Sequence, residues 1–128
     1  MALHKNFING EWVEGKGIRE NINPSDLTDI VGEYAQADRA QTEAAIAAAK
    51  AAQPTWAATT PQVKADILET IGTELLARKD EIGRLLSREE GKPLSNGIAE
   101  TMRAAQIFKF FAQETLRTEG VAVSSVRP

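Results

Sequence analysis

Short apolar stretches separated by turn residues predict strands in the first part of the chain. Two apolar pairs, Phe7-Ile8 and Trp12-Val13, flank Asn9-Gly10. Asn and Gly tolerate the positive φ that a two-residue hairpin turn requires, so this segment predicts a β-hairpin. The stretches Ile18–Ile22 and Asp29–Gln36 carry β-branched and aromatic residues on either side of a turn. Each of them predicts a further strand.

After residue 37 the spacing of apolar residues becomes that of helices. Asp38 followed by Gln41 resembles a capping box, and the alanine-rich stretch Arg39–Gln53 favours a helix. We expect Pro54 to interrupt this helix, because proline lacks the backbone N–H donor. Thr60-Pro61 is a second start signal. Apolar residues then recur every four positions, at Val63, Ile67, Ile71 and Leu75. This stripe predicts an amphipathic helix.

Two more helices are predicted before the chain returns to β-type residues. Asp80 is expected to cap a short helix that stops at Gly91, and Ser95 or Asn96 to open a last helix that ends at Gly120. The apolar stripe of the last helix comprises Ile98, Met102, Ala105, Phe108 and Phe111. The sequence therefore predicts an α+β, predominantly helical segment with an N-terminal β-hairpin. It divides into a β region (1–37), a helical region (38–120) and a tail (121–128) of β-type residues that reads as truncated.

Composition narrows the range of functions for this 128-residue chain. Hydrophobic residues make up 42% but aromatic residues only 5%, so much of the apolar content is alanine and the core available to the chain is thin. The net charge of −3 without a basic block argues against binding to nucleic acid or to an anionic membrane. No apolar run approaches the roughly 20 residues of a membrane span, and a cytoplasmic location is the default expectation.

Few residues in the sequence have the spacing of an active site. There is no cysteine and a single histidine, His4, without a partner nearby in sequence. Gly91-Lys92-Pro93 lacks the second glycine and the Ser or Thr of a phosphate loop. Glu89 and Glu90 are adjacent on a predicted helix, so they point about 100° apart and do not form a facing acid/base pair. Two acidic residues oppose the dipole at a helix C-terminus, which suggests that one of them has another role, such as binding a cation.

The order of the motifs resembles the aldehyde dehydrogenase superfamily. The stretch Phe7–Trp12 looks like the opening of that family, and Asn21–Pro24 followed by Ile30–Gly32 is similar to its next segment. The alanine-rich helix with Trp56, the helix Pro61–Arg78 and the motif Glu89–Pro93 follow in the family's usual order. Together these pieces cover essentially the whole chain.

A narrower resemblance links the chain to bacterial 2,5-dioxopentanoate (α-ketoglutarate semialdehyde) dehydrogenases. It is carried by Ser87–Lys92, Ile107–Ala112 and Ser125–Pro128. The resemblance implies a three-part parent with a Rossmann-like domain for NAD or NADP, a catalytic domain and an oligomerisation arm. This chain would be the N-terminal part of the cofactor-binding domain.

The implied reaction is attack of a thiol on the aldehyde, hydride transfer to NAD(P)+ and hydrolysis of a thioester to the carboxylate. The catalytic cysteine, glutamate and asparagine and the cofactor loop lie beyond Pro128 in the family. The chain alone is therefore expected to be inactive and to bind no NAD or NADP.

One family site maps onto this sequence in part. Some family members bind a monovalent cation with backbone carbonyls before the Asn-Pro turn and with an acidic side chain before the Gly-Lys pair. The matching positions are Asn21, Ile22 and Glu89, where many family members have aspartate in place of Glu89. Oxygen ligands suit a hard cation, and a cation there would account for the acidic helix end.

Two functional hypotheses remain open on the sequence alone. The first is a fragment of an aldehyde-oxidising enzyme, whose partners are the remainder of the dehydrogenase chain and further copies in a homo-oligomer. The second is a stand-alone helical interaction or scaffold module without catalytic activity. In either case the apolar stripes need a covering surface, and we expect the isolated segment to self-associate.

Overall fold

Residues 3–117 are described by a computed structural model, in which five short strands precede four helices. The strands are β1 (Leu3–His4), β2 (Asn6–Ile8), β3 (Glu11–Val13), β4 (Gly17–Ile22) and β5 (Ile30–Gln36). The helices are α1 (Arg39–Ala58), α2 (Pro61–Ala77), α3 (Lys79–Glu90) and α4 (Leu94–Thr115). The predicted α+β class, mainly helical with an N-terminal hairpin, is confirmed.

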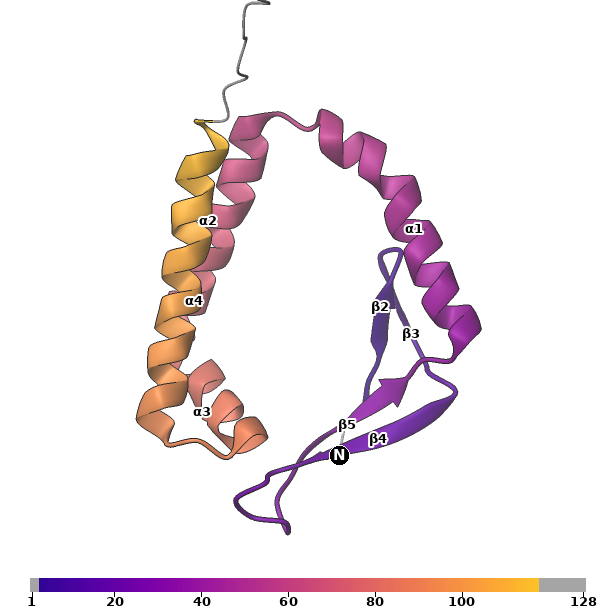
Figure 1. Ribbon diagram of the computed structural model, residues 1–128, viewed down its shortest axis with the longest axis vertical. Coiled ribbons are helices and arrows are strands. Elements are labelled where there is room, and N and C mark those ends of the chain that lie inside the picture. The colour runs from indigo at the N-terminus through magenta and orange to yellow at the C-terminus, as the bar shows by residue number, and fades with distance from the viewer. Residues whose placement is uncertain (1–2, 118–128) are drawn as a thin grey trace, which may run out of the picture.

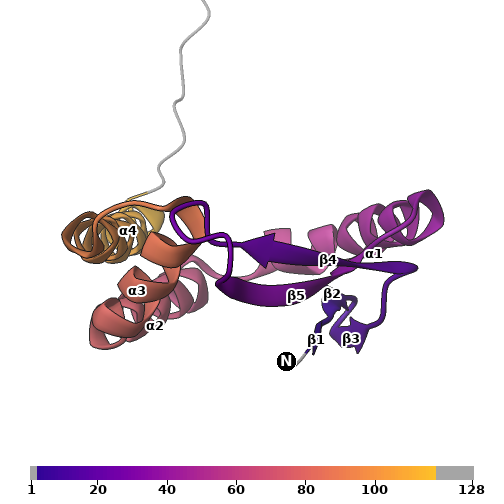
Figure 2. The same ribbon diagram turned by 90° about the horizontal axis from the view of Figure 1, so that it is seen from below.

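The elements form an open arch (Figure 1). Strands β2 and β3 lie beside α1 on one side of the arch, while α2 and α4 run antiparallel to each other on the other side. The view from below shows β4 and β5 extending between the α3 end and α1 (Figure 2). Within the described part of the chain, no helix combines the length and the apolar character that crossing a membrane requires.

The strands form a hairpin and a separate three-stranded sheet. In the hairpin Phe7 pairs with Trp12, and the turn residues Asn9 and Gly10 have φ values of 54° and 83°. The predicted turn is therefore confirmed. In the sheet, β5 lies between an antiparallel β4 and a parallel β1, a two-residue strand that the sequence pattern did not indicate.

Three of the predicted helix signals are found at the predicted residues. The Asp38 Oδ1 atom accepts a hydrogen bond of 2.8 Å from the Gln41 backbone N–H, which caps α1. The Thr60 hydroxyl caps α2 with a longer contact of 3.5 Å to the backbone N–H of Val63. Gly91 ends α3 in the left-handed conformation, at φ 70°. These signals are local, so the sequence alone places them.

The expected interruption of the first helix at Pro54 is wrong. Helix α1 continues through Pro54 to Ala58, so that Trp56 lies inside the helix. Proline removes the hydrogen bond to the carbonyl of Lys50, but Lys50 is exposed and water can solvate that group. The neighbouring side chains are mostly alanines, which leave room for the ring.

The expected starts of the last two helices are also wrong. Helix α3 begins at Lys79 directly after Arg78, which also ends α2, so Asp80 lies in the first turn and caps nothing. Helix α4 begins at Leu94, before Ser95 and Asn96, because the carbonyl of Pro93 accepts the first helical hydrogen bonds. This helix ends at Thr115, and the expected end at Gly120 and the tail lie outside the described residues.

Small residues make the contacts among the last three helices. The buried positions of α4 are Gly97, Thr101, Ala105 and Ala112, and those of α2 are Ala65 and Gly72. A Cβ atom on Gly72 would lie 3.0 Å from the Ala105 carbonyl oxygen, so these helices approach closely. The predicted large apolar stripe of α2 faces away from α4: its first three residues, Val63, Ile67 and Ile71, are 47%, 41% and 36% exposed.

Candidate functional site

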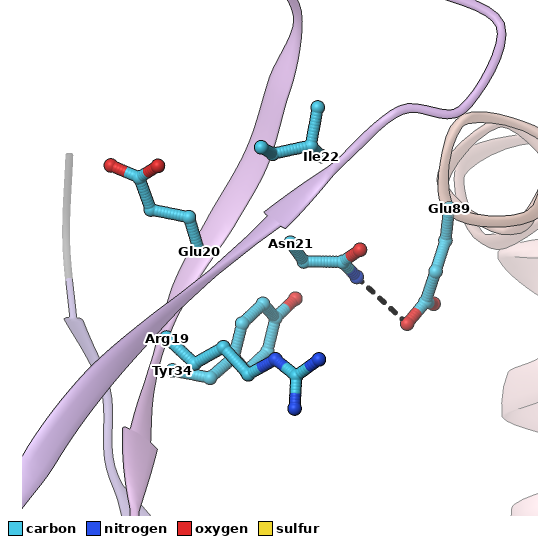
Figure 3. Close-up of a pocket in the computed structure, with 6 residues that line it drawn as sticks. All are labelled: Arg19, Glu20, Asn21, Ile22, Tyr34 and Glu89. Carbon is cyan, nitrogen blue, oxygen red and sulfur yellow. Dashed lines mark hydrogen bonds between the residues drawn. The ribbon is translucent and has the colours of Figure 1, made fainter. Parts of the chain in front are cut away.

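An open pocket lies between the sheet and the C-terminal end of α3. Its volume is about 510 Å³, and it is lined by Arg19, Glu20, Asn21, Ile22, Tyr34 and Glu89. The first four belong to β4, Tyr34 belongs to β5 and Glu89 comes from the last turn of α3 (Figure 3). The pocket contains all three residues of the predicted cation site, although Glu89 is 68 positions from Asn21 in sequence.

The alternation of side chains along the strands decides which groups face α3. Arg19 and Asn21 are two residues apart in β4 and therefore lie on the same face of the sheet. Tyr34 is the direct partner of Arg19 in β5 and shares that face. The side chain of Glu20 points to the opposite side (Figure 3). The face toward α3 thus carries a guanidinium, an amide and a phenol opposite the Glu89 carboxylate.

One hydrogen bond crosses the pocket. The Asn21 Nδ2 group donates to Glu89 Oε1 at 2.9 Å. Glu89 is exposed and lies where the free carbonyls of a helix C-terminus carry partial negative charge. The carboxylate and the helix end bring negative charge to the pocket, and the Arg19 guanidinium on the facing strand brings positive charge.

The two adjacent glutamates of α3 have separate partners, as the helical spacing predicts. Glu89 contacts Asn21, whereas Glu90 pairs with Lys92 Nζ at 2.6 Å. Lys92 also contacts both carboxylate oxygens of Glu100 at 2.7 Å. Hydrogen bonds to Glu100 and to Glu90 raise the pKa of Lys92. Glu90 is therefore engaged away from the pocket.

An ion pair beside the pocket fixes the end of α3 to the strands. Arg88 Nε donates to Asp29 Oδ2 at 2.9 Å, and a terminal nitrogen of Arg88 donates to Asp29 Oδ1 at 2.5 Å. Asn23 Nδ2 donates to Asp29 Oδ2 at 3.1 Å. The hydrogen bond from Arg88, followed by that from Asn23, lowers the pKa of Asp29 from 3.8 to about 2. This two-point geometry sets the position of the neighbouring Glu89.

The turn after β4 packs directly on the end of α3. The Ser25 hydroxyl donates to the Gly91 carbonyl at 3.0 Å. A Cβ atom on Gly91 would lie 2.7 Å from Ser25 Oγ and 2.8 Å from Pro24 Cγ, so the site requires glycine for space as well as for its positive φ. The Asn-Pro turn and the Gly-Lys motif, separate in sequence, are therefore one structural unit.

The pocket has a limited set of ligands for a metal ion. Among residues 3–117 there is no group of three or more His, Cys, Asp or Glu side chains placed to hold a metal. A cation here would depend on one carboxylate and on backbone carbonyls, beside the Arg19 guanidinium. The β4–β5 register shifts between Asn21 and Ile22, where Val31 is left without a partner. Such a bulge disrupts the backbone ladder next to the two residues whose carbonyls the resemblance implies.

Sequence reasoning missed several residues of this region. Arg19 and Tyr34 carried no motif, and their place in the pocket follows from strand pairing. Arg88 appeared only as part of the resemblance, and its partner Asp29 is 59 positions away. His4, which has no partner nearby in sequence, is exposed in β1 with its ring stacked on Tyr34 at 4.8 Å between ring centroids.

Comparison with known proteins identifies a family. Residues 12–128 match the model of the aldehyde dehydrogenase family. The α-ketoglutarate semialdehyde dehydrogenase of Haloferax volcanii is 34% identical over 126 residues, which are 97% of this chain and 26% of that protein. The 1-pyrroline-5-carboxylate dehydrogenase 2 of Bacillus subtilis is 34% identical over 119 residues, which are 92% of this chain and 23% of that protein.

The fold is shared with solved structures of full-length enzymes. The NAD-dependent benzaldehyde dehydrogenase of Corynebacterium glutamicum superposes with a TM-score of 0.88 at 35% identity, over 98% of this chain and 28% of that one. The chain thus spans about a quarter of the length of the relatives that it matches.

Proposed function

We propose, from the premise that this chain belongs to the aldehyde dehydrogenase family, that the protein carrying it oxidises an aldehyde to a carboxylate with NAD+ or NADP+. The family match over residues 12–128 carries the proposal. The relatives are longer than this sequence, so the activity refers to the whole protein that contains it.

In this proposal residues 1–128 form the N-terminal part of the cofactor-binding domain and have a structural role. The sequence contains no cysteine and no Gly-x-Gly-x-x-Gly motif, so these residues fit neither the thiol nucleophile nor the dinucleotide loop. Both would come from elsewhere in the protein. The exposed apolar face of α2 would be covered by the rest of the dehydrogenase.

The proposed substrate is a small semialdehyde, with α-ketoglutarate semialdehyde as the first choice. The similarity to the Haloferax volcanii enzyme supports this choice. The Bacillus subtilis relative of similar identity is named for 1-pyrroline-5-carboxylate, so both substrates belong in the first assays. Residues 1–128 would contribute little to this selectivity, because the catalytic groups lie outside them.

We further propose a monovalent cation in the pocket, held by the backbone carbonyls of Asn21 and Ile22 and by the Glu89 carboxylate. The cation would join the strand layer to α3 beside the Asp29–Arg88 ion pair. The role of the cation would be structural, because it would replace the hydrogen bond between Asn21 of β4 and Glu89 of α3, which are far apart in sequence. The protein is also proposed to be a cytoplasmic homo-oligomer that binds neither nucleic acid nor membranes.

The first measurement is the intact mass of the native protein, followed by turnover of NAD+ and of NADP+ with the two aldehydes. A mass several-fold above 13.9 kDa together with aldehyde-dependent reduction of the cofactor is expected. The isolated 128-residue chain is the control and should show no turnover. A native mass near 13.9 kDa without turnover would favour the scaffold hypothesis instead.

A further inference from the structure

The chain contains two Asn-Gly pairs that the sequence alone does not distinguish. Asn9-Gly10 forms the tip of the β2–β3 hairpin, and Asn96-Gly97 lies in the first turn of α4. The backbone nitrogen of the residue after an asparagine can attack the side-chain carbonyl carbon and displace the amide as ammonia. Glycine favours this attack because it has no Cβ atom to hinder it and adopts torsions that other residues avoid. The surroundings of each pair therefore decide which one reacts.

The hairpin tip leaves the reacting atoms accessible. Asn9 and Gly10 are both exposed, and no residue among 3–117 accepts a hydrogen bond from the Gly10 N–H. A Cβ atom on Gly10 would meet no atom within 4 Å beyond those of its chain neighbours. An open groove of about 340 Å³ lies between residues 7–10 and the alanine face of α1, which comprises Ala45, Ala48, Ala49 and Ala52. Water therefore reaches the pair, and the tip has room to change shape.

Little free energy is needed to open this turn. Ring closure requires a change in the turn torsions, where Asn9 has a φ of 54° and Gly10 a φ of 83°. The hairpin is held by three residue pairs, and none of residues 6–13 is buried. A side-chain hydrogen bond of 2.9 Å from Asn6 Nδ2 to Gln41 Oε1 joins it to α1. A short two-stranded element without a buried side chain is marginally stable and opens locally at low cost.

The second pair is held by the helix that contains it. The N–H groups of Asn96 and Gly97 both donate to the Pro93 carbonyl, at 3.0 and 3.3 Å. Gly97 is buried, and a Cβ atom there would overlap the Gly83 carbonyl oxygen and Ser87 Oγ of α3. The Gly97 nitrogen approaches the Asn96 side chain only when the first turn of α4 unwinds and the contact with α3 breaks. Opening of a packed helix costs much more than opening of an exposed turn.

We propose that Asn9 is a site of spontaneous deamidation and that the fold protects Asn96 from the same reaction. The Gly10 backbone nitrogen loses its proton to solvent and forms a bond to Asn9 Cγ. The bond from Cγ to Nδ2 breaks, and the amide group takes up a proton and leaves as ammonia. A water molecule then opens the resulting succinimide ring at either of its carbonyls. One opening yields aspartate at position 9, and the other yields isoaspartate, in which the main chain runs through the former side chain.

The two products have different effects on the hairpin. Aspartate keeps the geometry of the turn, because Asp-Gly suits a two-residue turn as Asn-Gly does, and it adds a negative charge. Isoaspartate inserts an extra carbon into the backbone of the turn, so the pairing of Phe7 with Trp12 loses its register. The rings of these two residues, whose centroids are 4.9 Å apart, then separate. The hairpin thus changes structure with the age of the protein molecule.

Peptide mapping of the native protein compares the two pairs within one sample. The protein is incubated in mildly alkaline buffer and digested at acidic pH. Mass spectrometry coupled to chromatography then separates asparagine, aspartate and isoaspartate at positions 9 and 96. The same incubation in urea is the control, because unfolding removes the difference between the hairpin tip and the helix. In the folded protein Asn9 should lose its amide at least about tenfold faster than Asn96, and in urea the two rates should approach each other.

Asn9→Gly is the matched variant, because Gly-Gly also forms two-residue turns. It should abolish the product in the N-terminal peptide and leave the rate at Asn96 unchanged. Equal rates at the two positions in the folded protein, or a faster rate at Asn96, would overturn the proposal. An intact Asn9 after an incubation that deamidates both pairs in urea would also overturn it, since the turn would then protect the amide.

Discussion

The contact between α3 and the strands and the contact between α2 and α4 hold the chain together in opposite ways. The first contact is polar: Arg88 forms an ion pair with Asp29, the Ser25 hydroxyl donates to the Gly91 carbonyl, and the Asn21 amide donates to Glu89. At the second, small residues such as Ala65 and Ala105 are buried and let two helix backbones approach.

The difference shows which surfaces of the chain still require a covering partner. The polar contact joins α3 to the strands through side-chain hydrogen bonds and borders a pocket. The helix pair buries alanine and glycine but leaves large apolar side chains exposed on its outer faces, with Ile67 on α2 and Phe110 on α4 among them. An apolar face of this kind is typical of an interface. The first region is therefore held by specific polar contacts, and the second resembles one layer of a larger assembly.

The largest expected effect is at the contact between α3 and α4. A Cβ atom on Gly83 would lie 2.7 Å from both Cα and N of Ile98, and this backbone has no room to move. Gly83→Ala should lower the free energy of unfolding by about 2 kcal/mol, despite the better helix propensity of alanine. Urea unfolding followed by circular dichroism measures the change. An unchanged midpoint would show that α3 and α4 are not in tight contact.

Loss of the ion pair should have a smaller effect that depends on pH. The pKa of Asp29 is lowered from 3.8 to about 2, so the folded state binds this proton less readily than the unfolded state. The stabilisation is complete above about pH 4 and is lost as the pH falls through about 2. Urea midpoints of the native chain and of Asp29→Asn should therefore differ at neutral pH and converge on acidification. A difference that stays constant down to pH ~2 would contradict the pair.

Gly72 tests the contact of α2 with α4, where the expected effect is smaller than that of Gly83 between α3 and α4. A Cβ atom there would lie 2.8 Å from Cγ of Lys109, a flexible side chain, and 3.0 Å from the Ala105 carbonyl oxygen. Lys109 is able to move, so the clash and the gain in helix propensity nearly cancel. Gly72→Ala should change the unfolding free energy by less than about 1 kcal/mol. A loss as large as that of Gly83→Ala would mean that the contact between α2 and α4 is as rigid as the contact between α3 and α4.

The smallest effect on stability is expected at the outer face of α2. Ile67→Gln should change the unfolding free energy by no more than about 0.5 kcal/mol, because the side chain is 41% exposed and does not face α4. The same change should reduce self-association of the isolated chain, which light scattering measures. Thr70→Ala, on the same face, is the control. Unchanged self-association of the Ile67→Gln variant would show that the chain associates through another surface.

The local elements were predictable because their signals act over a few residues. The turn at Asn9-Gly10, the caps at Asp38 and Thr60 and the stop at Gly91 follow from backbone torsions and from nearby hydrogen bonds. The prediction failed at two positions where neighbouring residues changed the outcome of a general rule for helix ends. Pro54 is tolerated on an exposed helix of small residues, and Asp80 caps nothing because α3 follows α2 without a gap.

The sequence by itself determined the class of fold, the order of its elements and, through its motifs, the family. It indicated only weakly that Glu89 has a special role, and the residues that accompany Glu89 came from a resemblance. Tertiary structure decided that Glu89 meets Asn21, that Arg88 meets Asp29 and that α2 turns its large apolar face outward. Contacts between residues some 60 positions apart depend on the path of the whole chain, which no local propensity specifies.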